Sequence, residues 1–178
     1  MGIRVNVSEQ EDQAGAREPL PAGKYHVAVT DVQLQESQSD DNFGKPMMNF
    51  EFTVQDTPGA WQKHANRKDF TNACLWDGAL YTIIMVLKAM PSEQGNDNAY
   101  EDCKDANGEL DIPTEPEFYL GQDLIIRRGL DPKQKKKWPD MPERWIQIRG
   151  ILPYDQETAH KSNATGRAPR EATDSLLP

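Results

Sequence analysis

Long apolar runs are absent from this sequence, and their absence excludes two classes of protein. No stretch of about 18 apolar residues is present, which is the length that a membrane-spanning helix needs. No basic segment followed by an apolar one comes after Met1, so a secretory signal is not expected either. Hydrophobic residues make up only 37% of the chain, and the mean hydropathy is −0.80. We therefore expect a cytoplasmic protein that has no membrane partner.

Cysteine and histidine are also scarce, and the few that occur lack the pattern of a metal or catalytic site. Cys74 and Cys103 stand 29 positions apart with no CxxC motif, which favours two free thiols over a disulfide or a zinc site. His26, His64 and His160 have no neighbouring Cys, Asp or Glu in the arrangement of a metal centre or a catalytic triad. Glycine-rich phosphate loops are missing too. The sequence predicts no metal, no cofactor and no enzymatic activity.

What the chain does contain is an uneven distribution of charge. Its net charge is −9, from 20 Lys and Arg against 29 Asp and Glu. Residues 127–149 reverse this sign, because they hold eight basic and three acidic side chains and carry a local charge of +5. The remainder holds 12 basic and 26 acidic residues. Such a split predicts one anion-binding site on a body that repels polyanions elsewhere, and nucleic acid is the obvious polyanion.

A length of 178 residues suits one domain with ragged ends. Residues 1–18 and 154–178 are polar and show no regular periodicity, which predicts two flexible terminal segments. Residues 19–153 then form the domain. Within it, residues 92–117 are acidic and punctuated by Asn, Gly and Pro, so we expect an inserted surface loop of low order.

Alternation of apolar and polar residues predicts five strands. The clearest is 48–54, and 25–34 also alternates except that the parity of its apolar positions changes near Thr30 and Asp31. A change of parity within one strand predicts a β-bulge at that point. The other three strands are expected at 67–72, 118–128 and 144–152.

An amphipathic helix is predicted between the third and fourth strands. Its apolar stripe, spaced i, i+4, i+7, i+8 and i+11, consists of Trp76, Leu80, Ile83, Ile84 and Leu87. Three strands, a helix and two strands is the order of a five-stranded OB-like barrel, whose connection between the fourth and fifth strands commonly contacts nucleic acid. The basic segment occupies that connection. The predicted fold is therefore mainly β, an OB-like barrel with one helix and flexible ends.

The basic segment combines cations with tryptophan, as single-strand binders do. Cations follow the phosphates, and aromatic faces stack on bases at roughly 1–3 kcal/mol per base. The candidate nucleic-acid-binding residues are Arg127, Arg128, Lys133, Lys135, Lys136, Lys137, Trp138, Arg144, Trp145 and Arg149. Two structural alternatives stay open: Trp145 heads a strand and fits a core equally well, and Lys135–Lys137 would also keep a hairpin soluble.

Other strands offer side chains that would complete a binding groove. These are Lys24, His26, Asn49, Thr53, Arg67, Lys68 and Phe70. Taken singly, each also fits an ordinary solvated strand face. Trp61 lies in a polar connection, and it is either a stacking residue or a lid over one end of the barrel.

Four short motifs within residues 19–153 give the chain a family resemblance. They read Leu20-Pro21-Ala22-Gly23-Lys24-Tyr25, Gly44-Lys45-Pro46-Met47-Met48, Leu87-Lys88-Ala89-Met90 and Tyr119-Leu120-Gly121-Gln122-Asp123-Leu124. In these the sequence resembles small bacteriophage proteins of the LP-x-G-x-Y type, described as single-stranded-DNA-binding proteins or as domains of unknown function. The resemblance implies an OB-like fold and a non-catalytic role in phage DNA replication or recombination, in the host cytoplasm. It assigns no contact residue, because the motifs consist of turns and core positions.

The leading hypothesis from the sequence is a protein that captures single-stranded DNA by charge and stacking through residues 127–149. Replication or recombination proteins would be its further partners. The alternative is a protein-interaction or virion-assembly module built on the same barrel, because one fold hosts many functions. A nuclease ranks third, since no compact acidic motif lies at a strand end.

Overall fold

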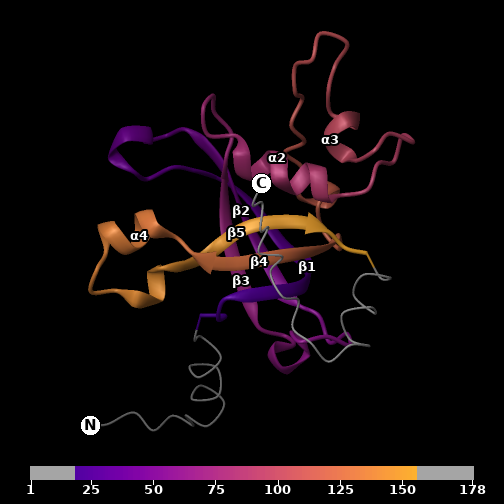
Figure 1. The fold of residues 1–178 in the computed structure, drawn as a ribbon. Helices are drawn as coiled ribbons and strands as arrows, with labels where there is room; N and C mark the ends of the chain where they lie inside the picture. Colours follow the sequence, from indigo (N-terminus) through magenta and orange to yellow (C-terminus); the bar gives the residue numbers. More distant parts are fainter. Residues whose placement is uncertain (1–18, 156–178) are drawn as a thin grey trace, which may run out of the picture.

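The computed structural model describes residues 19–155, which form a mainly β structure around one antiparallel sheet (Figure 1). The five strands lie in the order β3-β2-β1-β4-β5. Their bounds are Gly23–Glu36 (β1), Pro46–Val54 (β2), Lys68–Cys74 (β3), Asp123–Leu130 (β4) and Ile146–Pro153 (β5). The sequence therefore predicted the class and the chain order of the five strands and the main helix correctly, but it expected one helix and missed two short ones at Ala99–Asp102 and Pro132–Lys137. The expected flexible segment 1–18 and residues 156–178 of the expected tail 154–178 lie outside the described residues, whereas Tyr154 of that tail packs on His26.

Strand β1 forms the centre of the sheet because it pairs with two neighbours. Residues 23–28 pair with β4, and residues 27–36 pair with β2. The register with β2 shifts between Val29 and Asp31, which confirms the predicted bulge. One extra residue at this point lets Val29 and Val32 both face the core, and it bends the strand.

The core lies on the inner face of the sheet. Strand β2 alternates most regularly, as its sequence predicted, and every second side chain is fully buried: Met48, Phe50, Phe52 and Val54. Leu124 and Ile126 of β4 face the same interior. Burial of this many large apolar groups supplies the main driving force for folding, at roughly 25 cal/mol per Å² of apolar surface.

Helix α2 (Tyr81–Ala89) covers the core and is the predicted helix between the third and fourth strands. It buries Ile83 and Leu87 and packs against β3 and β5. Trp76 and Leu80 were predicted on the same stripe, but they precede the helix and are only half-buried. The helix ends at Met90, whose extended backbone is the conformation favoured before a proline.

The sheet is not closed into a barrel. Among the described strands, β3 and β5 are the edges and do not pair with each other. One buried ion pair links the two sides: the guanidinium of Arg128 on β4 lies 2.5 Å from the carboxylate of Asp69 on β3. Arg128 also donates a hydrogen bond of 2.8 Å to the carbonyl of Ile146 on β5. Side chains and α2 thus connect the edges that backbone hydrogen bonds would join in a closed barrel.

Strand β4 begins later than the predicted residue 118. Residues Pro116–Phe118 form a 3-10 turn instead, because a proline has no N–H to donate to a strand ladder. Tyr119 follows, fully buried, and its hydroxyl donates a hydrogen bond of 2.7 Å to the carbonyl of Pro113. Gly121, with φ of 79°, then makes the turn into β4 in a conformation that glycine adopts without strain.

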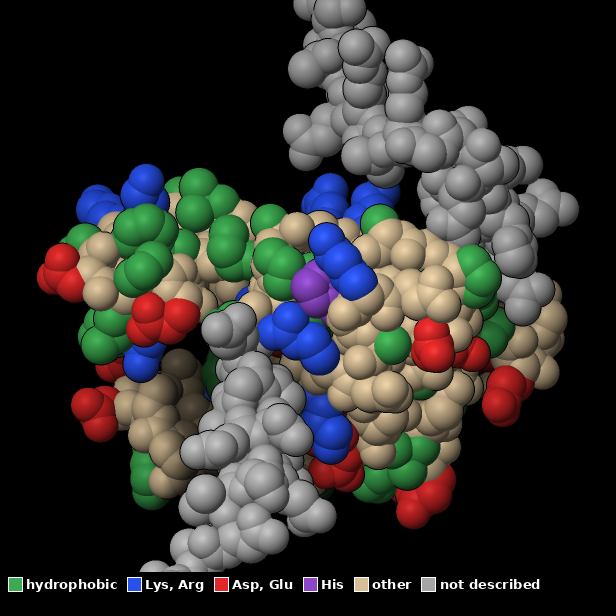
Figure 2. Space-filling view, turned by 90° about the horizontal axis from the view of Figure 1, so that it is seen from below, with side chains coloured by type: hydrophobic (Ala, Val, Ile, Leu, Met, Phe, Trp, Pro, Cys, Tyr) green, Lys and Arg blue, Asp and Glu red, His purple; other side chains and the backbone are tan. Residues whose placement is uncertain are grey.

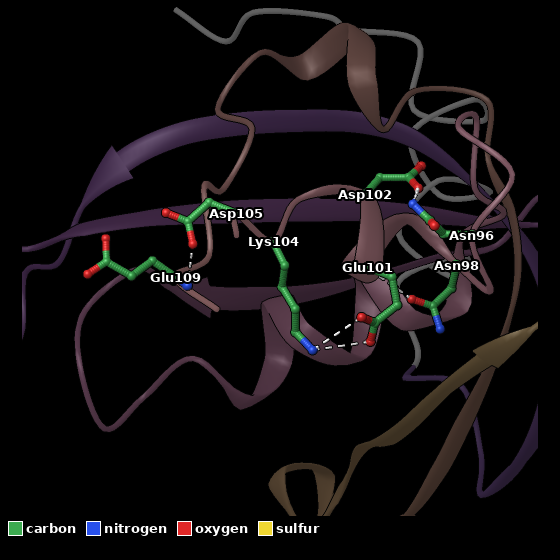
Figure 3. A network of polar contacts seen from close by, with 7 residues as sticks. All are labelled: Asn96, Asn98, Glu101, Asp102, Lys104, Asp105 and Glu109. Carbon is green, nitrogen blue, oxygen red and sulfur yellow. Dashed lines mark hydrogen bonds and ion pairs between the residues drawn. The ribbon is translucent and has the colours of Figure 1, made fainter. Parts of the chain in front are cut away.

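The acidic segment 92–117 is more ordered than the sequence predicted. The Asp102 carboxylate accepts hydrogen bonds from the Ser92 hydroxyl at 2.6 Å and from the Asn96 amide at 2.7 Å, the second of which is drawn in Figure 3. Asn98 caps the short helix α3 (Ala99–Asp102) with its side-chain oxygen. Local hydrogen bonds from polar side chains fix this segment where apolar residues are scarce, which hydrophobic periodicity does not detect.

Candidate nucleic-acid interface

The connection between β4 and β5, residues 131–145, folds into a basic arm that carries a short helix. Helix α4 (Pro132–Lys137) begins at Asp131, whose carboxylate accepts a hydrogen bond of 2.9 Å from the N–H of Lys133. Pro132 suits the first helical position, where no N–H donor is needed. The sequence prediction treated this connection as a loop, although Asp followed by Pro is a helix-start signal.

The lysines of the basic arm form its cationic surface. Lys133, Lys135, Lys136 and Lys137 are all exposed. Within residues 19–155, none of the four has a carboxylate at ion-pair distance. The nearby carboxylate of Asp131 is already engaged, because it caps α4 and lies 3.1 Å from the guanidinium of Arg149. Uncompensated cations on one short element raise the local potential and attract anions.

Trp145 joins the two ends of the basic arm. Its indole N–H donates a hydrogen bond of 2.8 Å to the carbonyl of Trp138, and its own carbonyl accepts one of 2.6 Å from the N–H of Asp131. The ring is half-buried, with the Lys135 ammonium 5.2 Å from its centre. Of the two alternatives for Trp145, the structure therefore favours a packing role over an open stacking surface.

Trp138 is better placed to meet a ligand. It ends α4, is half-buried like Trp145, and carries cations over its ring: the Arg144 guanidinium lies 4.4 Å and the Lys137 ammonium 5.5 Å from the ring centre. Such contacts hold the ring and the charges together before any ligand arrives. A base stacking on Trp138 would therefore have phosphate-binding groups next to it.

The four predicted arginines have different environments. Arg127 is exposed on β4 opposite Lys24 of β1, so the two cations lie side by side on the outer face. Arg144 covers Trp138, and Arg149 is half-exposed but paired with Asp131. Arg128 differs from the others, because only 7% of its surface is exposed and its charge is paired inside the protein. We therefore leave Arg128 out of the binding surface.

The Arg128 ion pair explains why a basic residue at this position is structural. Burial raises the pKa of the Asp69 carboxyl, and the positive charge of Arg128 opposes that rise. An unpaired charge buried at this depth would be strongly unfavourable, whereas the pair is tolerated. A run of Arg127 and Arg128 in sequence thus places one guanidinium outside and the other inside, as alternation along a strand requires.

Figure 2 shows the face on which the basic arm lies, with the arm at the left. Lys and Arg side chains lie at its left edge together with Asp and Glu side chains, and they appear again around a histidine near the centre, with hydrophobic side chains between the two groups. Two apolar residues of this end are well exposed, Leu130 at 50% and Met141 at 39%. Single-stranded nucleic acid has charged phosphates and flat bases, so a surface that is both cationic and apolar suits it.

His26 and Trp61 belong to the scaffold and not to a groove. His26 is only 3% exposed, and its ring nitrogens lie 2.7 Å from the Thr57 hydroxyl and 2.9 Å from the Asp123 carboxylate. Tyr154 stacks on the imidazole with ring centres 3.7 Å apart. Trp61 is 6% exposed and donates its indole N–H to Thr57. Trp61 is therefore a buried packing residue and not a stacking surface, and these contacts join four segments that are distant in sequence.

The outer face of β2 and β3 contributes little positive charge. Asn49 and Thr53 form hydrogen bonds to neighbouring side chains, and the ammonium of Lys68 is paired with Glu51 at 2.9 Å. Phe70, 54% exposed, is the large apolar residue there. Phosphate binding by this face would thus require breaking existing polar contacts, so the basic arm is the better anion site.

A cavity of about 410 Å³ lies away from the basic arm, under the acidic segment. Carboxylates line it, namely Glu93, Asp102, Asp105 and Asp111, together with Lys104. Their charge would repel a phosphate, so this cavity is not the expected site for nucleic acid.

The described residues offer few other functional features. Within residues 19–155, no helix is long and apolar enough to cross a membrane, and no three potential metal ligands lie together. Cys74 and Cys103 are free thiols, as predicted. Burial raises the pKa of both thiols, which makes them poor nucleophiles.

Comparison with known proteins does not identify the chain. No protein-family model matches it, and no curated protein matches its sequence. The resemblance to phage proteins therefore stays a prediction.

Proposed function

We propose that this protein binds single-stranded DNA, without catalysis, through the basic arm. The observation that carries the proposal is the combination on α4 of four exposed lysines with Trp138, whose ring is flanked by Lys137 and Arg144. The cations would neutralise phosphates while the indole stacks on a base. Single strands are favoured over duplex because the base faces of a duplex are already stacked.

The connectivity supports an OB-like fold for this function. If β3 and β5 paired, the observed order β3-β2-β1-β4-β5 would close into a five-stranded barrel. The helix α2 lies between β3 and β4 in the chain, as in that fold, and the basic arm is the connection between β4 and β5. In OB-fold proteins this connection is one of the loops that contact nucleic acid.

The charge distribution supports selective capture. Outside residues 127–149 the chain holds 26 acidic and 12 basic residues, so the rest of the protein repels a polyanion. A strand would be drawn to the basic arm and kept away from other surfaces. Such a protein would coat or protect single-stranded intermediates, and we propose phage DNA replication or recombination in the host cytoplasm as its setting.

The first test is a titration that follows tryptophan fluorescence with a mixed-sequence single-stranded 30-mer, its duplex form and the matching RNA. Stacking on Trp138 should quench the fluorescence, with the single strand binding more tightly than the duplex. The affinity should fall with salt, with a log–log slope near −3 if the four arm lysines each neutralise a phosphate at about −0.7 apiece. No response at low salt would refute the proposal.

A variant pair then tests the position of the site. Replacing Lys135, Lys136 and Lys137 with Gln should weaken binding to all single strands alike and reduce the salt slope by about 2. The matched control replaces Lys45, Lys88 and Lys104 with Gln, which changes the net charge equally at sites outside the arm. Equal losses in both variants would indicate a general charge effect, and the arm would not be the site.

One observation favours a second candidate, a protein-interaction or virion-assembly module. The hairpin of β1 and β2 exposes Leu34 at 54% and Phe43 at 71%, and such apolar side chains suit a protein partner. In that case the basic arm would dock on an acidic protein surface. The two candidates differ in the titration, because a protein adaptor predicts no quenching by any oligonucleotide.

A further inference from the structure

We infer that a strand bound by the basic arm continues to a second phosphate site on the β2–β3 connection, formed by Lys63, His64 and Arg67, and that His64 takes up a proton when this site is filled. We call these three residues the loop cluster. The inference rests on the proposed function and extends it, because the sequence predicted binding residues chiefly in 127–149 and gave His64 no role.

The loop cluster sits on a tight, well-anchored turn. Residues Gln62–His64 form a 3-10 turn directly after the buried Trp61. The N–H of His64 donates to the carbonyl of Trp61 at 2.8 Å, and the N–H of Arg67 donates to the carbonyl of His64 at 3.1 Å. These bonds gather the three basic side chains on one short connection before any ligand is present.

The contacts of His64 define its state in the free protein. Arg67 donates a hydrogen bond of 3.0 Å to Nδ1 of His64, which makes the imidazole a neutral acceptor at that atom. Burial and the charges of Arg67 and Lys63 lower the His64 pKa. A phosphate at the loop cluster would add negative charge and reverse the effect of the two cations. Binding and protonation would then favour each other.

Among residues 19–155, the groups around the imidazole do not neutralise the charge of Lys63. Tyr25 of β1 meets the His64 ring edge-on at 5.7 Å and presents no carboxylate. The charges of Arg128 and Asp69, which also lie near Tyr25, neutralise each other. The acid of the same connection, Asp56, accepts a hydrogen bond of 3.0 Å from the amide of Gln62. Within residues 19–155, no carboxylate lies at ion-pair distance from Lys63.

The basic arm and the loop cluster both lie near the start of β1. The arm extends from β4, where Arg127 stands opposite Lys24 on β1. Lys24 precedes Tyr25, whose ring contacts His64. Figure 2 shows Lys and Arg side chains around a histidine on the face that carries the arm, with hydrophobic side chains between them and the arm. The alternative path over β2 and β3 is less favourable, because Lys68 is already paired with Glu51.

The test of the second site uses Lys63→Ala and the matched control Lys88→Ala on α2. With the 30-mer, Lys63→Ala should bind about three- to tenfold more weakly at low salt, and its salt slope should be smaller by about 0.7. With the shortest oligonucleotide that still quenches Trp138, it should bind like wild type, because such a strand fills the arm only. The control should match wild type at both lengths.

The proton linkage has its own measurement. The imidazole pKa of His64, followed by NMR and assigned with His64→Gln, should rise when the 30-mer saturates the protein. Affinity for the 30-mer should accordingly increase as the pH falls below 6.5, and His64→Gln should abolish this part of the pH dependence.

An unchanged His64 pKa in a saturated complex, or a Lys63→Ala affinity equal to wild type at every length, would overturn the inference while leaving single-strand binding intact. No binding of the 30-mer at all would instead refute the proposed function.

Discussion

Removal of the buried guanidinium of Arg128 should destabilise the fold without removing a DNA contact. Arg128 connects three strands, because it pairs with Asp69 on β3, donates to Ile146 on β5 and lies on β4 itself. The variant Arg128→Met keeps the apolar length of the side chain but leaves the Asp69 carboxylate buried without its partner. Breaking a buried pair from one side costs about 3–5 kcal/mol.

The size of this loss should depend on pH. Burial already raises the pKa of Asp69 above its usual value of 3.8, and without Arg128 the pKa should rise further. When the pKa of a carboxyl is higher in the folded state than in the unfolded state, protonation of that carboxyl stabilises the folded state. This contribution to stability is fully present below the pKa of the unfolded state, and it is lost as the pH rises through the pKa of the folded state. The deficit of Arg128→Met should therefore be largest near pH 7 and smaller near pH 5.

Urea unfolding followed by tryptophan fluorescence measures this effect. With a slope of about 1–3 kcal/mol per molar urea, a loss of 3 kcal/mol lowers the midpoint by roughly 1 M or more. The double variant Asp69→Leu/Arg128→Met should recover most of the stability, because it removes both charges together. The opposite outcome would be an Arg128→Met variant that unfolds like wild type and yet loses affinity and salt slope for single-stranded DNA. Arg128 would then be an exposed contact and the edges of the sheet would be held in another way.

Three further variants test the basic arm and the scaffold. Trp138→Ala should weaken binding of the 30-mer by about 1–3 kcal/mol in a salt titration, and an unchanged affinity would exclude stacking there. Asp131→Ala removes the cap of α4, so the helix should lose about 1 kcal/mol of stability, visible as faster amide hydrogen exchange at Gln134. His26→Ala leaves Asp123 and Thr57 without their common partner, so the melting temperature should fall by several degrees while the salt slope of binding stays unchanged.

Much of the sheet could be read from local patterns. The alternation in β2 and the change of parity in β1 depend only on which face each residue takes, and both agree with the structure. The later start of β4 did not follow from the pattern, because Pro116 and Gly121 impose a turn on residues that are apolar enough for a strand. The order within 92–117 was missed for a related reason, since polar hydrogen bonds and not hydrophobic spacing maintain it.

The candidate site was predicted in part. The composition of residues 127–149 indicated a cationic, tryptophan-containing segment, and the structure places all four of its lysines on an exposed helix. It did not indicate that Arg128 faces inwards, because neighbouring arginines look alike until a partner such as Asp69 is brought near. The loop cluster gave an even weaker signal, since Lys63 and Arg67 are ordinary cations in a polar connection.

The sequence by itself determined the charge inversion, the strand faces and the order of the elements, since each of these depends on residue type and on neighbours close along the chain. Only the tertiary structure decided which charges are neutralised and which remain available. That outcome depends on contacts between residues far apart in sequence, such as Asp69 with Arg128 and Tyr25 with His64. Burial and pairing set the energy of a charge, and neither property belongs to a residue alone.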